Sequence, residues 1–422
     1  MASIEEQFKT AIADRDIAPA VVVASDAKGS LKYAKAFGPR SLKEGAPAEP
    51  LTEDATFWIA SCTKLMTAIA ALQCVERGQF KLDEDVTRLL PELKGIDVLK
   101  GFGEGTGKSV LVKATEKITL SRQLLTHSSG IAYDIFEPNL MRWRASRGEQ
   151  ASLGRGDMIY RGTVPLLFEP GESFAYSPGP DWAGVMIQRT NGMSLGKYMQ
   201  KYIWDPLGIK NMTFHLEDRP DMLERRAGTG ERMGGINPIF GCPADPSAKI
   251  QHGADGVSFW WRDEGVPDDS GGAGAFGSID DYQKILHSIT AGDGKLLSKE
   301  MNDELFRPCL SEMSRKQLMA LCTFKEINDI LGASLPVGTQ LDYAVGGAIC
   351  LEDMEGRRRK GTMHWLGLPN LYWFADRDAG MSGIYGSQTL APGDPQSAEM
   401  FKQFEVAMYK KAKETREAEQ KL

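Results

Sequence analysis

The sequence predicts a mixed α and β protein with strands near both ends of the chain and a long, mainly helical middle. Residues 4–13 show a helical spacing of apolar residues, and two short strand patterns, AVVVAS and LKYAKAF, follow around the turn residues DAKG. Near the other end, an amphipathic helix follows Pro395, and strand patterns precede it at residues 341–351, 361–365, 371–376 and 381–385. With 422 residues and 42% hydrophobic content, the chain can bury a large core in one large domain or two closely joined ones.

The middle of the chain is predicted to be helical because its apolar residues recur with a helical period. A helix that begins near Ser61 and ends at Gly78 has apolar residues at Leu65, Ile69, Leu72 and Val75. Further helical patterns read KITLSRQLLTH, DWAGVMIQRTNG and SLGKYMQKYIWDPLG.

Residues 226–277 are rich in Gly, Pro and Asp, and this stretch is long for an irregular loop within a compact domain. Loops of this length are often functional. Phe259, Trp260 and Trp261 inside it are therefore candidates for the wall of a substrate pocket. The alternative is that the three aromatic side chains only pack the loop down.

Charge and composition exclude several classes of function. A net charge of -7 argues against a nucleic-acid-binding protein, and the basic run at residues 357–360 is predicted to be a solvated strand end. No basic leader followed by an apolar stretch and no uncharged run of membrane-spanning length is found, so no membrane association and a cytoplasmic location are expected. Six scattered cysteines and five isolated histidines predict free thiols, no metal and no cofactor.

Two motifs match functional patterns only superficially. GFGEGTGKS at residues 101–109 resembles a phosphate-binding loop, but Phe102 stands where that pattern requires glycine and no buried strand precedes it. A flexible surface loop is predicted instead. A serine three residues before a lysine also occurs at Ser194 and Lys197, where the serine is more simply a helix N-cap after Asn191 and Gly192.

Ser61 and Lys64 have the same spacing in a different context. The apolar run FWIA leads into Ser61, and a helix starts there, so Lys64 lies one turn on and on the same side as the serine. A serine hydroxyl becomes a nucleophile when a neighbouring base removes its proton, and the helix N-terminus favours the developing anion. The backbone N–H of Ser61 could also serve as half of an oxyanion hole. The alternative is a capping serine and a lysine whose ammonium group reaches solvent, and this stretch alone leaves both open.

Two later segments offer partners for this pair. Tyr176 lies in a Gly- and Pro-flanked loop just before a helix, where a phenol can point into a cleft and carry protons. The segment GTMHWLGLPNLYWF contains a strand that ends at a glycine and could bring a backbone N–H opposite Ser61. The alternatives are a loop tyrosine bonded to a carbonyl and an edge strand with a glycine bulge.

These residues carry a resemblance to a known family. SCTK at 61–64, YSP at 176–178 and WLG at 365–367 occur in the order and rough spacing of the S-x-x-K, Y-x-N and K-T-G motifs. The chain thus resembles class C β-lactamases, penicillin-binding proteins and related serine esterases. LLTHSSG at 124–130 and SGGAGAFGS at 270–278 look like further landmarks of that family.

Within that family the chain is similar to fungal acyltransferases of the lovastatin pathway, through ALQCVERG, DWAG, PLGIKNMTF, RPDMLERRA, KILHS and LPNLYWFADRDAGM. The resemblance implies an α+β, β-lactamase/transpeptidase-like fold. An antiparallel sheet flanked by helices would be built from residues 1–92 and 271–422. A mainly helical domain with long substrate-side loops, residues 93–270, would be inserted, and the cleft would lie at the junction.

The resemblance also implies roles for single residues. Ser61 would be the acylated nucleophile, and Lys64 and Tyr176 would be the general-base and general-acid pair. The backbone N–H groups of Ser61 and Leu368 would form the oxyanion hole. The neighbouring Trp365, Leu366 and Gly367 are candidates for substrate binding, together with the aromatic cluster at 259–261.

The chain departs from the family pattern at three positions. Pro178 replaces the Asn of Y-x-N, and its consequence is not evident from the sequence. Trp365 replaces the K-T-G lysine, which removes the cation that would hold a β-lactam carboxylate and makes an apolar acyl group or a polycyclic substrate the expectation. Leu366 in the middle position should narrow the cleft.

The expected function is that of a serine acyltransferase that moves an acyl group from a thioester or ester to a hydroxyl of a secondary-metabolite acceptor. The partners expected are a small-molecule acyl donor and an alcohol acceptor, and an acyl carrier protein of a polyketide synthase is a further candidate donor. A carboxylesterase or lactone hydrolase would use the same residues, because the two differ only in how well the acceptor excludes water. A non-catalytic binding protein is the third hypothesis.

Overall fold

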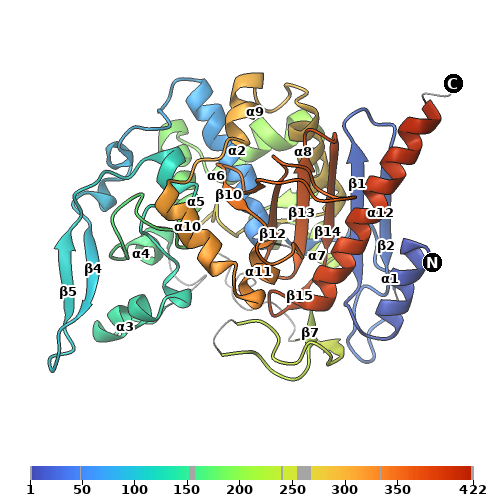
Figure 1. Ribbon diagram of the computed structural model, residues 1–422, viewed down its shortest axis with the longest axis horizontal. Coiled ribbons are helices and arrows are strands. Elements are labelled where there is room, and N and C mark those ends of the chain that lie inside the picture. Colours follow the sequence, from blue (N-terminus) through green and yellow to red (C-terminus); the bar gives the residue numbers. More distant parts are fainter. Residues whose placement is uncertain are drawn as a thin grey trace.

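The protein is described here by a computed structural model (Figure 1). It describes residues 2–47, 49–151, 157–238, 241–253, 268–332 and 334–419. Phe259, Trp260 and Trp261, the predicted aromatic wall, lie outside the described residues.

A seven-stranded antiparallel sheet forms one side of the molecule, in the order β10-β11-β12-β13-β14-β1-β2. The N-terminal hairpin pairs with the last of the C-terminal strands, for example Val22 with Tyr385. The two ends of the chain therefore build one sheet. Its strands are β1 (Ala20–Asp26), β2 (Lys32–Phe37), β10 (Leu341–Tyr343), β11 (Ala348–Cys350), β12 (Met363–Gly367), β13 (Leu371–Asp376) and β14 (Met381–Gly386).

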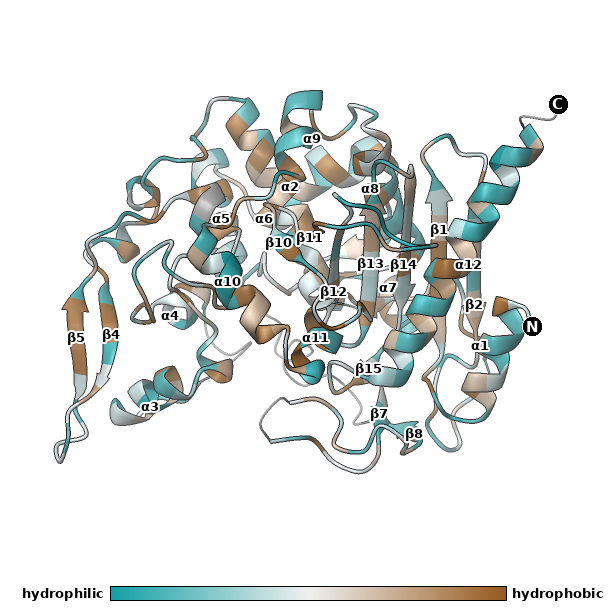
Figure 2. Ribbon diagram, viewed as in Figure 1, coloured by the Kyte–Doolittle hydropathy of each residue, from teal (hydrophilic) through white to brown (hydrophobic). Residues whose placement is uncertain are grey.

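Helices cover both faces of this sheet, because side chains alternate between the faces along each strand. On one face, Ser25 of β1 and Ser382 of β14 bond to Gln283 of α8 (Ile279–Ala291). On the other face, Tyr372 of β13 stacks on Phe401 of α12 (Pro395–Glu419), and α1 (Ile4–Ala13) packs beside it. Hydrophobic and hydrophilic colours alternate along α12 in Figure 2, as expected for a helix with one face against the core.

Helix α2 (Thr63–Glu76) is the centre of the helical part, and twelve of its residues, from Thr63 to Cys74, are buried. It packs against α5 (Gly179–Asn191) and α9 (Lys299–Leu305), so its first turn is held between the sheet and the helices. The other α-helices described are α3 (Pro138–Ser146), α4 (Met158–Gly162), α6 (Leu195–Met199), α7 (Pro220–Glu224), α10 (Glu312–Leu321) and α11 (Lys325–Gly332).

Three small sheets complete the fold. Strand β9 (Phe276–Gly277) lies between β3 (Phe57–Trp58) and β6 (Met212–Thr213), and β7 (Gly230–Arg232) lies between β15 (Thr389–Leu390) and β8 (Ile250–His252). The third is a hairpin of β4 (Asp97–Phe102) and β5 (Ser109–Lys113), which stands at the far left of Figure 1.

Most of the predicted elements are confirmed, and the α+β fold is the one the resemblance implied. The helix at 4–13, the strand at 371–376 and the helix after Pro395 match closely. Ser194 caps α6 by accepting a hydrogen bond from the Lys197 N–H, as predicted. The surface loop predicted at 101–109 is wrong at its ends, because Phe102 and Ser109 are paired in a hairpin.

The division into a domain of residues 1–92 and 271–422 and a domain of residues 93–270 stays a prediction. Every strand of the large sheet comes from residues 20–37 or 341–386. None of the helices in the described ranges is long and apolar enough to cross a bilayer.

The predicted solvation of the basic run at 357–360 is wrong for its first two residues. Arg357 and Arg358 are 8% and 0% exposed, and both bond to the Glu405 carboxylate of α12, at 2.6 and 2.8 Å. Burial raises the pKa of Glu405, but the charges on Arg358 and Arg357 outweigh it and hold that pKa below its ordinary value. A buried carboxylate thus compensates the charge of two buried guanidinium groups and ties α12 to the sheet.

We expect Glu405→Gln to lower the free energy of unfolding by about 3–5 kcal/mol, because it removes the charge of the carboxylate to which two buried arginines bond. The measurement is urea denaturation followed by circular dichroism. Glu417→Gln on the same helix is the control, since the ion pair described for Glu417, with Lys413 at 4.0 Å, is exposed and its loss should cost less than about 1 kcal/mol. Equal and small losses in both variants would contradict this account.

Candidate active site

The predicted nucleophile lies in a tight turn between β3 and α2. Residues Ala60–Cys62 form a single 3-10 turn, and the Cys62 N–H donates to the carbonyl of Ile59. Ala60, directly before Ser61, has φ 45°, in the left-handed region that residues other than glycine rarely adopt. Such backbone strain persists only where the surroundings enforce it, and it is common at active sites. The turn leaves Ser61 half-buried at the start of the helix.

Lys64 is buried, with 3% exposure, and its amine nitrogen has three hydrogen-bond partners among the described residues. Its Nζ donates to Ser61 Oγ at 3.2 Å, to the Tyr133 hydroxyl at 3.2 Å and to the Gly272 carbonyl at 2.7 Å. The alternative in which Lys64 extends to solvent is therefore wrong. The helix turn and these acceptors aim the amine at the serine.

Tyr176 approaches the same serine from the segment before α5. Its hydroxyl lies 2.7 Å from Ser61 Oγ, and Lys64 Nζ lies 4.6 Å from the centre of its ring. Ser61 Oγ is thus within hydrogen-bond reach of two groups that can accept or return its proton. The three residues singled out in the sequence meet at one point, in the arrangement that activates a nucleophilic hydroxyl.

The rings of His127 and Trp365 pack against the ring of Tyr176. His127 lies 4.7 Å from the Tyr176 ring and Trp365 lies 5.6 Å from it, between ring centres. Burial lowers the pKa of His127 well below its ordinary value, and the charge on Lys64 lowers it further. The imidazole is therefore neutral, and its Nδ1 accepts a hydrogen bond from the Ser177 N–H at 3.2 Å.

The end of strand β12 lies against the nucleophile turn. A Cβ atom on Gly367 would come within 2.5 Å of the Ile59 carbonyl oxygen, so only glycine allows this approach. Strand β12 is an interior strand of the sheet, and the alternative of an edge strand is wrong. Leu368, the next residue, is half-buried beside Trp58 and Ala60. Its role as second oxyanion donor, with the Ser61 N–H, stays a prediction.

The other two residues of this motif are buried: Trp365 is 1% exposed and Leu366 is 6% exposed. Their predicted contact with substrate is not tested by the structure. A separate apolar cluster includes Ala60, directly before Ser61, and Tyr176. Its buried members are Trp58, Ala60, Tyr133, Leu216, Met222, Ala273 and Phe276, with Ile135, Tyr176, Leu368 and Leu390 packed against them.

Tyr133, Asp181 and Gly272 are site residues that the sequence did not single out. Burial raises the pKa of the Tyr133 phenol well above its ordinary value, and the charges on Asp181 and Tyr176 raise it further, against the opposing charge of Arg161. Tyr133 therefore stays protonated and donates to Asp181. Asp181 and Gly272 lie in the segments DWAG and SGGAGAFGS, which the family resemblance had marked without a role. Tyr133 had no such signal.

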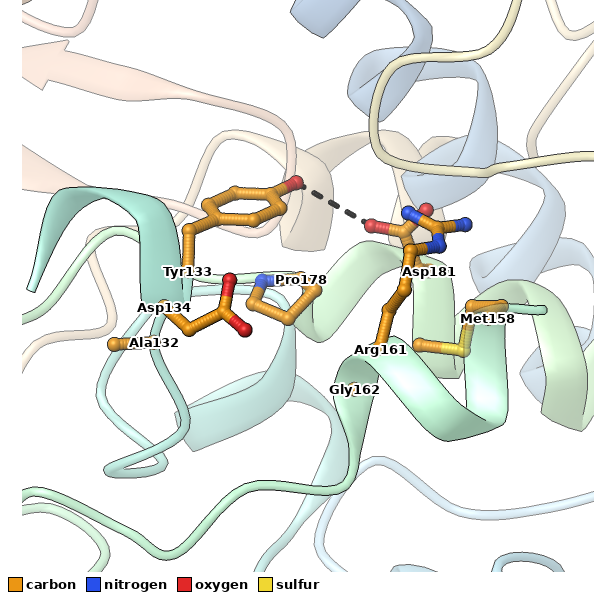
Figure 3. Close-up of a pocket in the computed structure, with 8 residues that line it drawn as sticks. All are labelled: Ala132, Tyr133, Asp134, Met158, Arg161, Gly162, Pro178 and Asp181. Atoms are coloured by element: carbon orange, nitrogen blue, oxygen red, sulfur yellow. Dashed lines mark hydrogen bonds between the residues drawn. The ribbon is translucent and has the colours of Figure 1, made fainter. Parts of the chain in front are cut away.

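A small pocket with a cavity volume of about 10 Å³ adjoins these residues, and Figure 3 shows the Tyr133 to Asp181 hydrogen bond at its side. Arg161 extends into it from α4, and Pro178, which stands where the family has Asn, forms part of its wall. The lining residues are Ala132, Tyr133, Asp134, Met158, Arg161, Gly162, Pro178 and Asp181. Across the described ranges, no three His, Cys, Asp or Glu side chains gather in a way that could hold a metal ion.

The serine, lysine and tyrosine of this site occur in a chain whose residues 8–406 match the family model for β-lactamases. The chain belongs to the β-lactamase family. It is 36% identical to the monacolin J acid methylbutanoyltransferase of Aspergillus terreus over 411 residues, which cover 96% of this chain and 95% of the relative. It is 35% identical to the lovastatin esterase of Penicillium rubens over 417 residues, 97% of this chain and 98% of that one.

A solved structure gives the same picture of this β-lactamase-family protein. A variant of simvastatin synthase from Aspergillus terreus superposes with a TM-score of 0.87 at 36% identity, and the match covers 97% of this chain and 95% of that one. The relatives of this chain thus include proteins named as an acyltransferase and as an esterase.

We expect Gly367→Ala to slow acylation of Ser61 by about 100-fold, because the added methyl group pushes β12 away from the nucleophile turn, and a displacement of about 1 Å is enough for such a loss. The measurement is the release of p-nitrophenol from a short-chain ester. Gly294→Ala is the control: its φ of +74° makes alanine unfavourable there too, but its Cβ would meet no atom within 4 Å. Equal rates in the two variants would refute the assigned contact.

Proposed function

We propose that the protein is a serine acyltransferase that carries an acyl group on Ser61 from a thioester or ester donor to a hydroxyl of a secondary-metabolite acceptor. The observation that carries the proposal is the position of Ser61 Oγ, 2.7 Å from the Tyr176 hydroxyl and 3.2 Å from Lys64 Nζ. The similarity to a methylbutanoyltransferase over 96% of the chain supports transfer as the reaction.

The reaction proceeds in two steps. Ser61 Oγ attacks the donor carbonyl while its proton passes to the Tyr176 and Lys64 pair, and the departing thiol or alcohol takes that proton when the acyl-enzyme forms. The acceptor hydroxyl then gives its proton to the same pair and attacks the acyl carbonyl, and Ser61 leaves as the free hydroxyl. In both steps the N–H groups of Ser61 and Leu368 would stabilise the oxyanion.

The walls of the site favour an apolar acyl group. The apolar cluster around Ser61 offers no charged side chain to an acyl chain, and it keeps water away from the ester. Trp365, where the family has its K-T-G lysine, is buried among rings and leaves no cation there for a β-lactam carboxylate. The donor in this proposal is a thioester or ester, either a small molecule or a thioester on an acyl carrier protein of a polyketide synthase.

The acceptor in this proposal carries a carboxylate. The name of one relative specifies an acid, monacolin J acid, as its acceptor. In the pocket beside Tyr133, Arg161 provides the guanidinium group whose planar fork suits a carboxylate. An acceptor held there by its acid group would extend its hydroxyl toward Ser61.

The alternative function is ester hydrolysis by the same residues, and the similarity to a lovastatin esterase favours it. The two functions share the acyl-enzyme and differ in the molecule that removes the acyl group. Transfer predicts that an alcohol discharges the enzyme faster than water does.

We expect wild-type protein, briefly incubated with a short-chain acyl thioester, to gain the mass of one acyl group in intact-protein mass spectrometry, and Ser61→Ala to gain none. A hydrophobic alcohol should discharge the adduct faster than buffer alone, because it competes with water for the acyl carbonyl. Discharge at the same rate with and without every alcohol offered would indicate a hydrolase. An adduct on Ser61→Ala would overturn the proposed nucleophile.

We expect wild-type protein to prefer a carboxylic-acid acceptor over its methyl ester and Arg161→Met to lose that preference. The ratio of kcat/KM for the acid to kcat/KM for the ester should fall by about 10- to 100-fold, since a hydrogen bond to a charged group contributes about 1.5–3 kcal/mol. The measurement is transfer from one thioester to the acid and to its ester under single-acceptor conditions. Arg142→Met is the control, because Arg142 is exposed and stacks on Phe102 of the hairpin. A preference unchanged in Arg161→Met would place the acid elsewhere.

A further inference from the structure

One buried carboxylate holds two of the three groups that hold Lys64. Asp181, on the first turn of α5, is 3% exposed. Its Oδ2 accepts a hydrogen bond from the Tyr133 hydroxyl at 3.3 Å, and its Oδ1 accepts one from the Gly272 N–H at 3.1 Å. The same Tyr133 hydroxyl and the carbonyl of the same Gly272 accept hydrogen bonds from Lys64 Nζ.

The segment that carries Gly272 is fixed residue by residue. Ser270 Oγ also donates to Asp181 Oδ1, and the Gly271 carbonyl accepts from Thr67 Oγ1 on α2 at 2.7 Å. A Cβ on Gly272 would lie 2.2 Å from Asp181 Oδ2 and 2.7 Å from the Tyr133 hydroxyl oxygen. Asp181, Tyr133 and Gly272 are therefore packed together without space for an added methyl group on the glycine.

A lysine side chain needs such external restraint. Its stem has four methylene groups and carries about 2 kcal/mol of rotamer entropy, so helix geometry alone does not fix the amine. A protonated Tyr133 has a single proton to donate, and Asp181 accepts it, so the lone pairs of that oxygen are left for Lys64. The carboxylate in this way sets the direction of the bond between the two side chains.

We infer that Asp181 is a positioning residue that fixes the Lys64 amine against Ser61 by holding Tyr133 and Gly272. This inference rests on the proposed function, in which Lys64 serves as a base for Ser61. Asp181 accepts hydrogen bonds from Tyr133, Gly272 and Ser270 and not from Ser61, so in the donor half-reaction its effect is on the rate of acylation and not on binding of the ester.

Asp376 offers a matched control elsewhere in the fold. It is fully buried at the end of β13 and accepts hydrogen bonds from the Tyr409 hydroxyl at 2.7 Å and from the N–H groups of Arg359 and Ala379 at 3.0 and 2.8 Å. Like Asp181, it accepts from one phenol and from main-chain N–H groups. It serves the sheet and α12 instead of Lys64, so the substitution Asp376→Asn measures the cost of losing such a carboxylate without affecting Lys64.

The experiment compares Asp181→Asn with Asp376→Asn in the full-length protein, using a p-nitrophenyl ester in pre-steady-state acylation and in steady state. In Asp181→Asn the new amide group donates to Tyr133 and competes with Lys64 for the same oxygen. The acylation rate should fall by about 10- to 100-fold while KM for the ester changes less than about 3-fold. Asp376→Asn should lower the melting temperature but keep the acylation rate within about 2-fold of wild type.

The outcomes separate the two claims. If Ser61→Ala forms no adduct but Asp181→Asn acylates as fast as Asp376→Asn, the positioning role is overturned and the proposed function stands. If Ser61→Ala still forms the adduct, the proposed function and the inference are both overturned. Should Asp181→Asn not fold, Tyr133→Phe and Ser270→Ala each remove one bond to the carboxylate. Both should slow acylation without raising KM, and wild-type rates in both would overturn the inference.

Discussion

The burial of Lys64 is the constraint on which the rest of the site depends. A buried amine without hydrogen-bond partners is costly, so Lys64 Nζ must meet polar groups in the folded protein. These partners come from three stretches of chain: the turn at Ser61, the segment at Tyr133 and the segment at Gly272. Once α2, α5 and the segment after residue 268 pack together, the position of the amine follows.

The sheet supplies the other half of the site through a backbone contact. Gly367 at the end of β12 touches the carbonyl of Ile59, and the Ile59 N–H bonds to Ala275 on the opposite side. The turn that presents Ser61 is thus held from both sides by main chain, which explains how the unfavourable φ of Ala60 is maintained. Rigid elements position Ser61, and the side chains of the helical part position Lys64.

The parts of the fold that the sequence predicted were those encoded locally. The period of apolar residues and the turns between them predicted the helix at 4–13 and the strands at 371–376 and 381–385, and the last of these is observed at 381–386. Ser61 and Lys64 could be paired because a helix turn places residues i and i+3 together. The contacts of Tyr133 with Asp181 and of Arg358 with Glu405 join residues 48 and 47 positions apart. No local pattern encodes such pairs. The sequence therefore does not indicate the contact between Tyr133 and Asp181, and it predicts solvation for Arg357 and Arg358, which are buried.

In the proposed function, the positions of Trp365 and Arg161 account for how a β-lactamase-family fold could act on an acyl donor and an acidic acceptor instead of a β-lactam. Trp365 fills the β12 position that carries a lysine in the family pattern, and its ring packs on Tyr176 and Tyr343 in the core. In the proposed enzyme the cation for an acidic substrate is Arg161 on α4, which lines the pocket beside Tyr133. With Trp365 in place of the lysine, the sheet side of the site can accept an apolar acyl group. With Arg161 on the helical part, the acid group of the acceptor would bind on the helical side. Because the two substrates then bind to different walls, one serine can take the acyl group from one side and pass it to the other.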